Sequence, residues 1–213
     1  VPHDMTGLIE LYGGADKYIE RLNANFEKSE PYGFFRSNKT KEGNWTDYGN
    51  QPRTGMAHLF NYAGAPWLTQ KWVRKVKAAY SDVTPYGGYR DDEDQGQMGA
   101  LGVLMAIGLF EVDGGCAEKP FYEITSPLFD KVTIHLVNRY YPGKTFQIIT
   151  VGNSTDNMYI QRASFNGKKW NKCWFYHEDF IKGGTLELQL GTTPNKKWGI
   201  EEFPPSSVSS DKD

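Results

Sequence analysis

The chain has 213 residues, and its 24 basic and 26 acidic side chains leave a formal net charge of −2. Nucleic acids and anionic membrane surfaces are usually bound through a strong basic excess, so this balance argues against both kinds of partner. No run approaches the roughly 20 consecutive apolar residues that a membrane-spanning helix needs, which predicts a protein without a membrane span.

Aromatic residues make up 15% of the chain, beside 23 Gly and 11 Pro. This composition favours a loop-rich protein with aromatic rings available at surfaces, although packing in the core is the commoner use of any single ring. The two cysteines, Cys116 and Cys173, have none of the spacings typical of a disulfide framework, a zinc site or a redox pair. They leave the compartment and the disulfide state open.

The first half of the chain is predicted to be helical. Apolar residues at three- and four-residue spacing predict helices over about residues 5–12, 16–26, 56–63, 67–80 and 95–108. Asp4 is placed to cap the first of these helices, and Gly13-Gly14 is placed to end it. Helices joined by loops, without strands between them, suggest the paired helices of a toroid or solenoid.

Residues 30–55 lack a sustained period and contain many turn-forming residues. Loops of this length are uncommon unless they are functional or disordered, and five aromatic residues argue against disorder. We interpret the segment as a binding loop, whose aromatic residues are Tyr32, Phe34, Phe35, Trp45 and Tyr48.

The second half changes to the two-residue alternation of β-strands. Strands are predicted over residues 121–125, 131–137, 145–151, 157–164, 172–177 and 185–190. Asn166-Gly167 indicates a hairpin, because both residues tolerate the positive φ of a type I′ turn. We therefore expect an α+β protein with a helical part over residues 1–115, an antiparallel sheet or sandwich over 116–203, and a frayed tail over 204–213.

Four successive acidic residues, Asp91 to Asp94, stand immediately before the last predicted helix. Capping and the helix dipole explain one or two acids at a helix N-terminus, but four like charges in a row repel one another. Carboxylates at this position are held as anions, which suits a general base that takes a proton from water. The cluster is therefore a candidate for water activation.

An EF-hand is excluded, because the glycine at position 96 comes one position early and no Glu closes the loop. Glycosidic cleavage with inversion needs a base and a separate acid roughly 6.5–9.5 Å away, to leave room for the water. The chain offers no second acid in a comparable context, so the residues by themselves indicate half of a mechanism.

The motifs of the chain, taken together, resemble glycoside hydrolase family 92. The resemblance covers nearly the whole chain and rests on VPHD at residues 1–4, GNQP at 49–52, LFNYAGAPW at 59–67, DEDQGQM at 92–98, YEITSPLFDKV at 122–132 and GGTL at 183–186. It implies a calcium-dependent, inverting exo-α-mannosidase that combines an N-terminal β-sandwich with a catalytic (α/α)6 toroid, in a periplasmic or extracellular location.

Within that resemblance, Asp92 and Asp94 correspond to the pair that activates the attacking water. The general acid of such enzymes is a Glu about ten residues before the VPHD motif. The resemblance therefore implies that this chain corresponds to a C-terminal portion of a larger enzyme, with its helical part forming a portion of the toroid. We expect the isolated chain to be inactive, and to bind the remainder of the enzyme or to self-associate through uncovered apolar faces.

The resemblance also gives candidate contacts to a mannose-containing glycan. These are Asn50 and Gln51 in the loop motif, His3 in the VPHD motif, and Trp45 as a stacking ring. Family members that act on α-1,2 linkages are similar to one another in a His-Glu pair where this chain has Asn50-Gln51, so α-1,2 specificity is not expected. The calcium ligands are not assigned. The alternative hypothesis is a non-catalytic carbohydrate-binding or structural fragment.

Overall fold

The computed structural model describes residues 3–35, 45–80, 83–84, 88, 93–137 and 139–206. Asp92, one of the two predicted water-activating residues, lies outside the described residues, whereas Asp94 lies within them. Residues 207–213, which are most of the predicted tail, also lie outside.

The helices of the described chain are α1 (Met5–Leu11), α2 (Ala15–Ser29), α3 (Pro66–Tyr80), α4 (Gln97–Ile107), the short α5 (His177–Phe180), and the 3-10 helices η1 (Glu30–Tyr32), η2 (Gln51–Arg53) and η3 (Met56–Ala63). Helices α1 to α4 and η3 form where the apolar periodicity predicted helices, whereas η1, η2 and α5 were not predicted. The predicted cap of α1 is confirmed, because the Gly7 N–H donates to Asp4 Oδ1 at 2.8 Å. The segment from Met56 differs in type, since it forms a 3-10 helix instead of an α-helix.

An aromatic core joins α2 to α3. The Trp72 ring is fully buried and stacks on Phe26 with ring centroids 5.1 Å apart, and its indole N–H donates to Asn23 Oδ1 at 2.9 Å. Three aromatic residues of the predicted binding loop are also buried in the core, namely Phe34, Phe35 and Tyr48. Most aromatic residues of that loop therefore stabilise the fold and do not line a binding surface.

The strands form two sheets. One has the order β1-β2-β7, with β1 (Leu109–Phe110), β2 (Phe121–Ile124) and β7 (Trp174–Tyr176). The other has the order β3-β4-β8-β5-β6, with β3 (Lys131–His135), β4 (Thr145–Val151), β5 (Tyr159–Phe165), β6 (Lys168–Lys169) and β8 (Gly184–Gly191). The predicted hairpin is confirmed between β5 and β6, where Asn166 and Gly167 have φ of 50° and 76°.

Two features of the sheets depart from the sequence-based expectation. β8 pairs with β4 in parallel and with β5 in antiparallel orientation, so the larger sheet is mixed and not purely antiparallel. Parallel neighbours need a long crossover, which the chain between β4 and β8 supplies. In addition, β1 lies before residue 115 and pairs with β2, but its two residues are too few to show an alternation.

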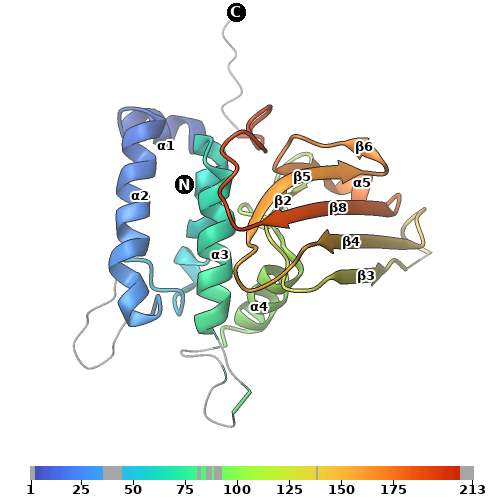
Figure 1. The fold of residues 1–213 in the computed structure, drawn as a ribbon, viewed down its shortest axis with the longest axis horizontal. Helices are drawn as coiled ribbons and strands as arrows, with labels where there is room; N and C mark the ends of the chain where they lie inside the picture. Colours follow the sequence, from blue (N-terminus) through green and yellow to red (C-terminus); the bar gives the residue numbers. More distant parts are fainter. Residues whose placement is uncertain are drawn as a thin grey trace, which may run out of the picture.

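The helical and β parts pack together through α3 (Figure 1). This helix lies between the α1–α2 layer and the five-stranded sheet, and Gln70 Oε1 accepts a hydrogen bond from the Ile160 N–H of β5 at 2.8 Å. Buried residues of both parts form one apolar cluster. The α+β class is therefore confirmed. Within the described residues, no helix combines the length and apolar character needed to cross a membrane.

Candidate active site

A left-handed turn places Asp94 directly before α4. Three consecutive residues have positive φ, with 58° at Asp94, 59° at Gln95 and 98° at Gly96. Non-glycine residues in this conformation cost on the order of 1–3 kcal/mol each and cluster at functional sites. Two of them in succession therefore mark the turn as a place where the fold tolerates strain to hold a particular geometry.

The side chain of Glu93 caps the N-terminus of α4. Its carboxylate accepts hydrogen bonds from the Gly96 N–H and from the Gly99 N–H, the latter at 3.1 Å. Asp94, by contrast, is partly exposed, and its side chain makes no hydrogen bond or ion pair with the part of the chain that the structure describes. Helix capping therefore explains the presence of Glu93 in the acidic cluster. It does not explain Asp94, whose carboxylate has no structural role in the described chain.

A cavity of about 320 Å³ lies where the loop motif meets α4, and we call it the Gln51 cavity. It is lined by residues of four segments, namely Met5 of α1, the stretch that includes Gln51 and Thr54, Gln97 of α4, and the end of β1 with Phe110 and Glu111. The Gln97 side-chain amide donates to Thr54 Oγ1 at 3.5 Å, and the Gln97 N–H donates to the Asp94 carbonyl at 3.3 Å. Asp94 does not line the cavity, but it precedes Gln97 by one helical turn.

The other predicted sugar contacts do not converge on this cavity. Asn50 is exposed directly before η2. His3 lines a different cavity of about 560 Å³, together with Tyr62 and Asp113. The Trp45 ring is 39% exposed and packs against Tyr32 with centroids 5.9 Å apart. The structure therefore brings Gln51 close to α4, but it places His3 in another cavity.

A buried polar network around Glu123 was not predicted from the sequence. The Asn61 side-chain amide donates to Glu123 Oε2 at 2.5 Å, the Tyr62 hydroxyl donates to Oε1 at 3.2 Å, and His58 Nδ1 lies 3.4 Å from Oε2. All four side chains are buried, with Glu123 fully so. Burial raises the pKa of the Tyr62 hydroxyl, and the negative charge of Glu123 raises it further.

This network supports the walls of both cavities. The His58 ring stacks on Phe110 with centroids 4.1 Å apart, and Phe110 lines the Gln51 cavity. Tyr62 lines the cavity that contains His3. Glu123 thus connects η3 to β2 through Asn61 and Tyr62. A Glu within the apolar strand segment FYEI is the sequence signal for such a network.

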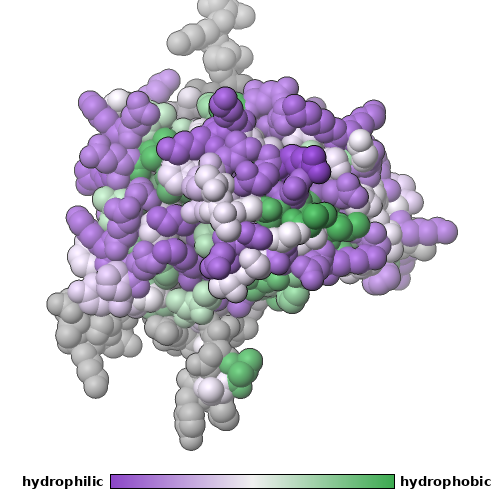
Figure 2. All heavy atoms as spheres, in the orientation of Figure 1, coloured by the Kyte–Doolittle hydropathy of each residue, from purple (hydrophilic) through white to green (hydrophobic). Residues whose placement is uncertain are grey.

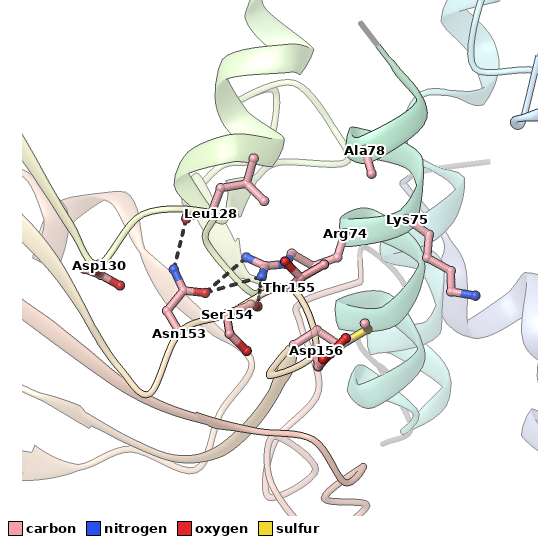
Figure 3. A pocket seen from close by; sticks show the side chains of 10 residues that line it. Arg74, Lys75, Ala78, Leu128, Asp130, Asn153, Ser154, Thr155 and Asp156 are labelled. Atoms are coloured by element: carbon pink, nitrogen blue, oxygen red, sulfur yellow. Dashed lines mark hydrogen bonds between the residues drawn. The ribbon is translucent and has the colours of Figure 1, made fainter. Parts of the chain in front are cut away.

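A third cavity of about 520 Å³ lies between α3 and the loop after β4 (Figure 3). The Arg74 guanidinium lies at its edge and is buried. It donates to the Pro127 and Ser154 carbonyls and, at 3.3 Å, to Asn153 Oδ1. The Asn153 side-chain amide in turn donates to the Leu128 carbonyl at 2.9 Å. None of the predicted site residues lines this cavity. The hydrogen bonds of Arg74 connect α3 to the segment before β3 and to the loop after β4.

We expect Arg74→Ala to lower the free energy of unfolding by about 2–3 kcal/mol, because it removes hydrogen bonds from a buried charged donor and leaves carbonyl acceptors unpaired. Urea denaturation followed by tryptophan fluorescence measures the change. The adjacent Lys75→Ala is a control, because it removes a partly exposed ion pair with Glu30 and a cation–π contact with the Trp72 ring, which together should cost about 1 kcal/mol. Equal effects of the two variants would contradict a structural role for Arg74.

The described residues do not form a complete calcium site. Among them, no group of three or more His, Cys, Asp or Glu side chains could hold a metal ion. Calcium takes 6–8 oxygen ligands, usually with several carboxylates among them. The donors described in this chain therefore do not fit the ion by themselves, and we derive no chemical step through it. Cys116 is exposed, Cys173 is buried, and both are free thiols.

Comparison with known proteins gives consistent matches. A sequence model described as the glycosyl hydrolase family 92 catalytic domain matches residues 1–192. A curated protein of Arthroderma benhamiae, described as an uncharacterized secreted glycosidase, is 35% identical over 212 residues, which cover 97% of this chain and 24% of that protein.

Solved structures agree with these sequence matches. The family GH92 alpha-mannosidase BT3965 from Bacteroides thetaiotaomicron has a TM-score of 0.79 and 28% identity, with 96% of this chain and 26% of that chain covered. The family GH92 inverting mannosidase BT2199 from the same organism also has a TM-score of 0.79, with 34% identity and coverage of 97% and 28%.

The fold and these matches define the class of protein as a glycoside hydrolase. More specifically, the chain belongs to glycosyl hydrolase family 92, because the family match extends over most of its length. The resemblance noted in the sequence motifs is thus confirmed. The chain spans about a quarter of the length of the relatives it matches.

Proposed function

We propose that this chain supplies the water-activating part of an inverting α-mannosidase that removes terminal α-linked mannose from glycans. Asp94 acts as the general base with Asp92 assisting it, and the general acid comes from outside this chain. The proposal rests chiefly on the different contacts of the two acids before α4. Glu93 caps the helix, whereas the Asp94 carboxylate makes no such contact and can accept a proton from water. The names of the solved relatives, an alpha-mannosidase and an inverting mannosidase, support the reaction type.

Asp94 can perform this role because of its charge and position. A carboxylate can accept a proton from water as a general base, and the Asp94 side chain makes no hydrogen bond with the described chain that would occupy it. The strained turn fixes its backbone, and Gln97 links that turn to the cavity containing Gln51. A hexose near Gln51 would therefore lie within reach of the turn. Asn50, which directly precedes Gln51, is the second proposed contact to this hexose, whereas the predicted contacts His3 and Trp45 do not line the Gln51 cavity and are not assigned to the same sugar unit.

A chimeric enzyme tests the proposal. The segment of the inverting mannosidase BT2199 that corresponds to this chain, about 28% of that protein, is replaced by the present sequence. We expect the purified chimera to release mannose from methyl α-mannoside with inversion, detected as the β-anomer by NMR, and the isolated chain to release none. A folded chimera that binds mannose but releases none would favour the alternative function, a non-catalytic carbohydrate-binding or structural role.

Mannobioses of defined linkage extend the test to specificity. We propose that α-1,2 linkages are disfavoured, because Asn50 and Gln51 stand where a His-Glu pair is expected for that linkage, and neither offers the charge of the Glu. The double substitution Asn50→His with Gln51→Glu in the chimera should raise the relative rate on the α-1,2 disaccharide. An unchanged linkage preference would contradict the proposal that Asn50 and Gln51 disfavour α-1,2 linkages.

We propose further that the complete enzyme requires calcium and acts outside the cytoplasm. The first part follows from the resemblance, and the calcium ligands would then include groups outside the described residues of this chain. The second part is supported by the description of the Arthroderma benhamiae relative as secreted. Chelation with EGTA should abolish the activity of the chimera, and added calcium should restore it.

Several apolar side chains are exposed on the surface of this chain, which indicates that a binding partner covers them. α4 buries Met98, Leu101 and Met105 on one side, whereas Val103 on the opposite side is 60% exposed, and Leu11 at the end of α1 is 86% exposed. Apolar side chains also interrupt the otherwise hydrophilic face that is shown over β4 and β8 (Figure 2). We propose that the remainder of the enzyme covers such faces, and that the isolated chain self-associates instead.

Light scattering after size exclusion checks this proposal. We expect the apparent mass of the isolated chain to rise above 24.2 kDa with concentration, because apolar surface is removed from water on association. The double variant Leu11→Glu with Val103→Lys should shift the equilibrium to the monomer. Val83→Lys is the matched control, because this valine is fully exposed and lies outside α1 and α4. A wild-type chain that stays monomeric at all concentrations would contradict the prediction.

A further inference from the structure

The imidazole ring of His58 lies behind the wall of the Gln51 cavity. It is 1% exposed and stacks on the Phe110 ring, with centroids 4.1 Å apart and 17° between the ring planes. Phe110 lines the cavity, whereas His58 is not among the described residues that line it. Any influence of His58 on a ligand in this cavity therefore passes through Phe110.

The Phe110 ring has little freedom to move. Gly55, which also lines the cavity, lies beside it, since a Cβ added at Gly55 would be 3.5 Å from Phe110 Cε1. Protein interiors are close-packed, so a side chain shifts only where a neighbour leaves room for it. As long as the imidazole covers one face of the Phe110 ring, the ring cannot move in that direction away from the cavity.

A buried carboxylate on another element lies beside the imidazole. His58 Nδ1 is 3.4 Å from Glu123 Oε2 of β2. The same carboxylate accepts hydrogen bonds from the Asn61 amide at 2.5 Å and from the Tyr62 hydroxyl at 3.2 Å. Burying polar and charged groups costs free energy, and apolar side chains of similar volume often stabilise a fold as well or better. The arrangement therefore favours a role in fixing one ring position over a role in filling space.

The size of the Gln51 cavity makes the position of this wall important. Its volume of about 320 Å³ is near the lower end of the range for small-molecule pockets, roughly 300–1,000 Å³. In a site this small, a displaced aromatic ring changes the fit of a ligand to the polar residues that share the cavity, such as Gln51 and Gln97.

We propose that His58 is a positioning residue for substrate binding, which holds the Phe110 ring at the wall of the Gln51 cavity and so sets the space available to the hexose. This inference rests on the proposed function, because it takes the ligand of the cavity to be the mannose unit. The wall contacts the bound sugar before and during the reaction alike. Its displacement therefore weakens binding and leaves the chemical step unchanged.

Steady-state kinetics of the chimeric mannosidase test this role. His58→Leu keeps an apolar side chain behind Phe110 but removes the flat ring, and we expect it to raise KM for methyl α-mannoside about tenfold with kcat nearly unchanged. His58→Phe restores a flat ring and should return KM to within about twofold of the parent, although it loses the contact with Glu123. Phe110→Leu should also raise KM, and adding His58→Leu to it should raise KM no further.

A control variant separates positioning from a general loss of stability. Ile148→Ala empties a buried site in β4 away from the Gln51 cavity, and it should lower the urea denaturation midpoint at least as much as His58→Leu without raising KM. If KM followed the denaturation midpoint across all variants, or if His58→Leu left KM unchanged, the positioning role would be overturned while the activity of the parent chimera upheld the proposed function. A folded parent chimera that releases no mannose would overturn the proposed function and this inference with it.

Discussion

In the chimeric mannosidase, Asp94→Asn is expected to lower kcat by about 10²–10⁴-fold while KM changes little. The carboxamide has nearly the same shape as the carboxylate but takes no proton from water, so the attacking nucleophile is not activated. Initial rates of mannose release from methyl α-mannoside give kcat and KM. Asp94 is suited to this substitution, because its side chain makes no hydrogen bond with the described chain and its removal leaves no structural partner unpaired.

Glu93→Gln is the matched control for Asp94→Asn. It changes the adjacent carboxylate, which accepts from the Gly96 and Gly99 N–H groups at the N-terminus of α4. The glutamine oxygen can still accept one of these bonds, so the expected result is a small loss of stability, about 0.5–1 kcal/mol, with kcat within a few-fold of the parent. If Glu93→Gln lowered kcat as much as Asp94→Asn, the acidic turn would act through structure, and Asp94 would lose its assignment as base.

Replacing Glu123 by alanine is expected to lower the free energy of unfolding by about 3–5 kcal/mol. Glu123 is fully buried, and it accepts hydrogen bonds from Asn61 and Tyr62 beside the His58 ring. Its removal leaves these groups buried without an acceptor and opens a cavity between η3 and β2. Such a change is large compared with the roughly 5–15 kcal/mol that stabilises a typical domain. Urea denaturation, followed by fluorescence and circular dichroism, measures it.

Two conservative variants show whether the network or the packing is responsible. Tyr62→Phe removes only one hydroxyl donor and should cost about 1–2 kcal/mol. Glu123→Gln keeps an acceptor in nearly the same volume and should cost less than Glu123→Ala. If Glu123→Ala were no more destabilising than the exposed Glu20→Ala, the carboxylate would not tie η3 to β2. The two cavities whose walls include Phe110 and Tyr62 would then need another support.

Local signals in the sequence predicted most of the secondary structure. The Asp4 cap, the apolar stripe of α2 and the Asn166-Gly167 turn each depend on neighbours within a few residues, so their geometry follows from local chemistry. The parallel pairing of β8 with β4 was not predicted, because the strands are far apart in sequence and alternation does not specify a partner. The motifs also predicted the family, since they preserve an ordered set of residues along the chain.

The candidate site was predicted less completely than the fold. Asp94 was identified because four acids before a helix are chemically unusual, but the sequence did not show that Glu93 is the residue that caps α4. Glu123 was not predicted as a site residue, and the structure buries it beside η3, where it pairs with Asn61.

By itself, then, the sequence determined the family, the helices, the strands and the acidic turn, since these depend on composition and on spacing along one segment. The tertiary structure decided which acid caps a helix, which carboxylates are buried, and which loops share a cavity. The physical reason is that burial and hydrogen bonding are set by groups from distant segments, here η3, β1 and β2, whose mutual positions no local pattern records.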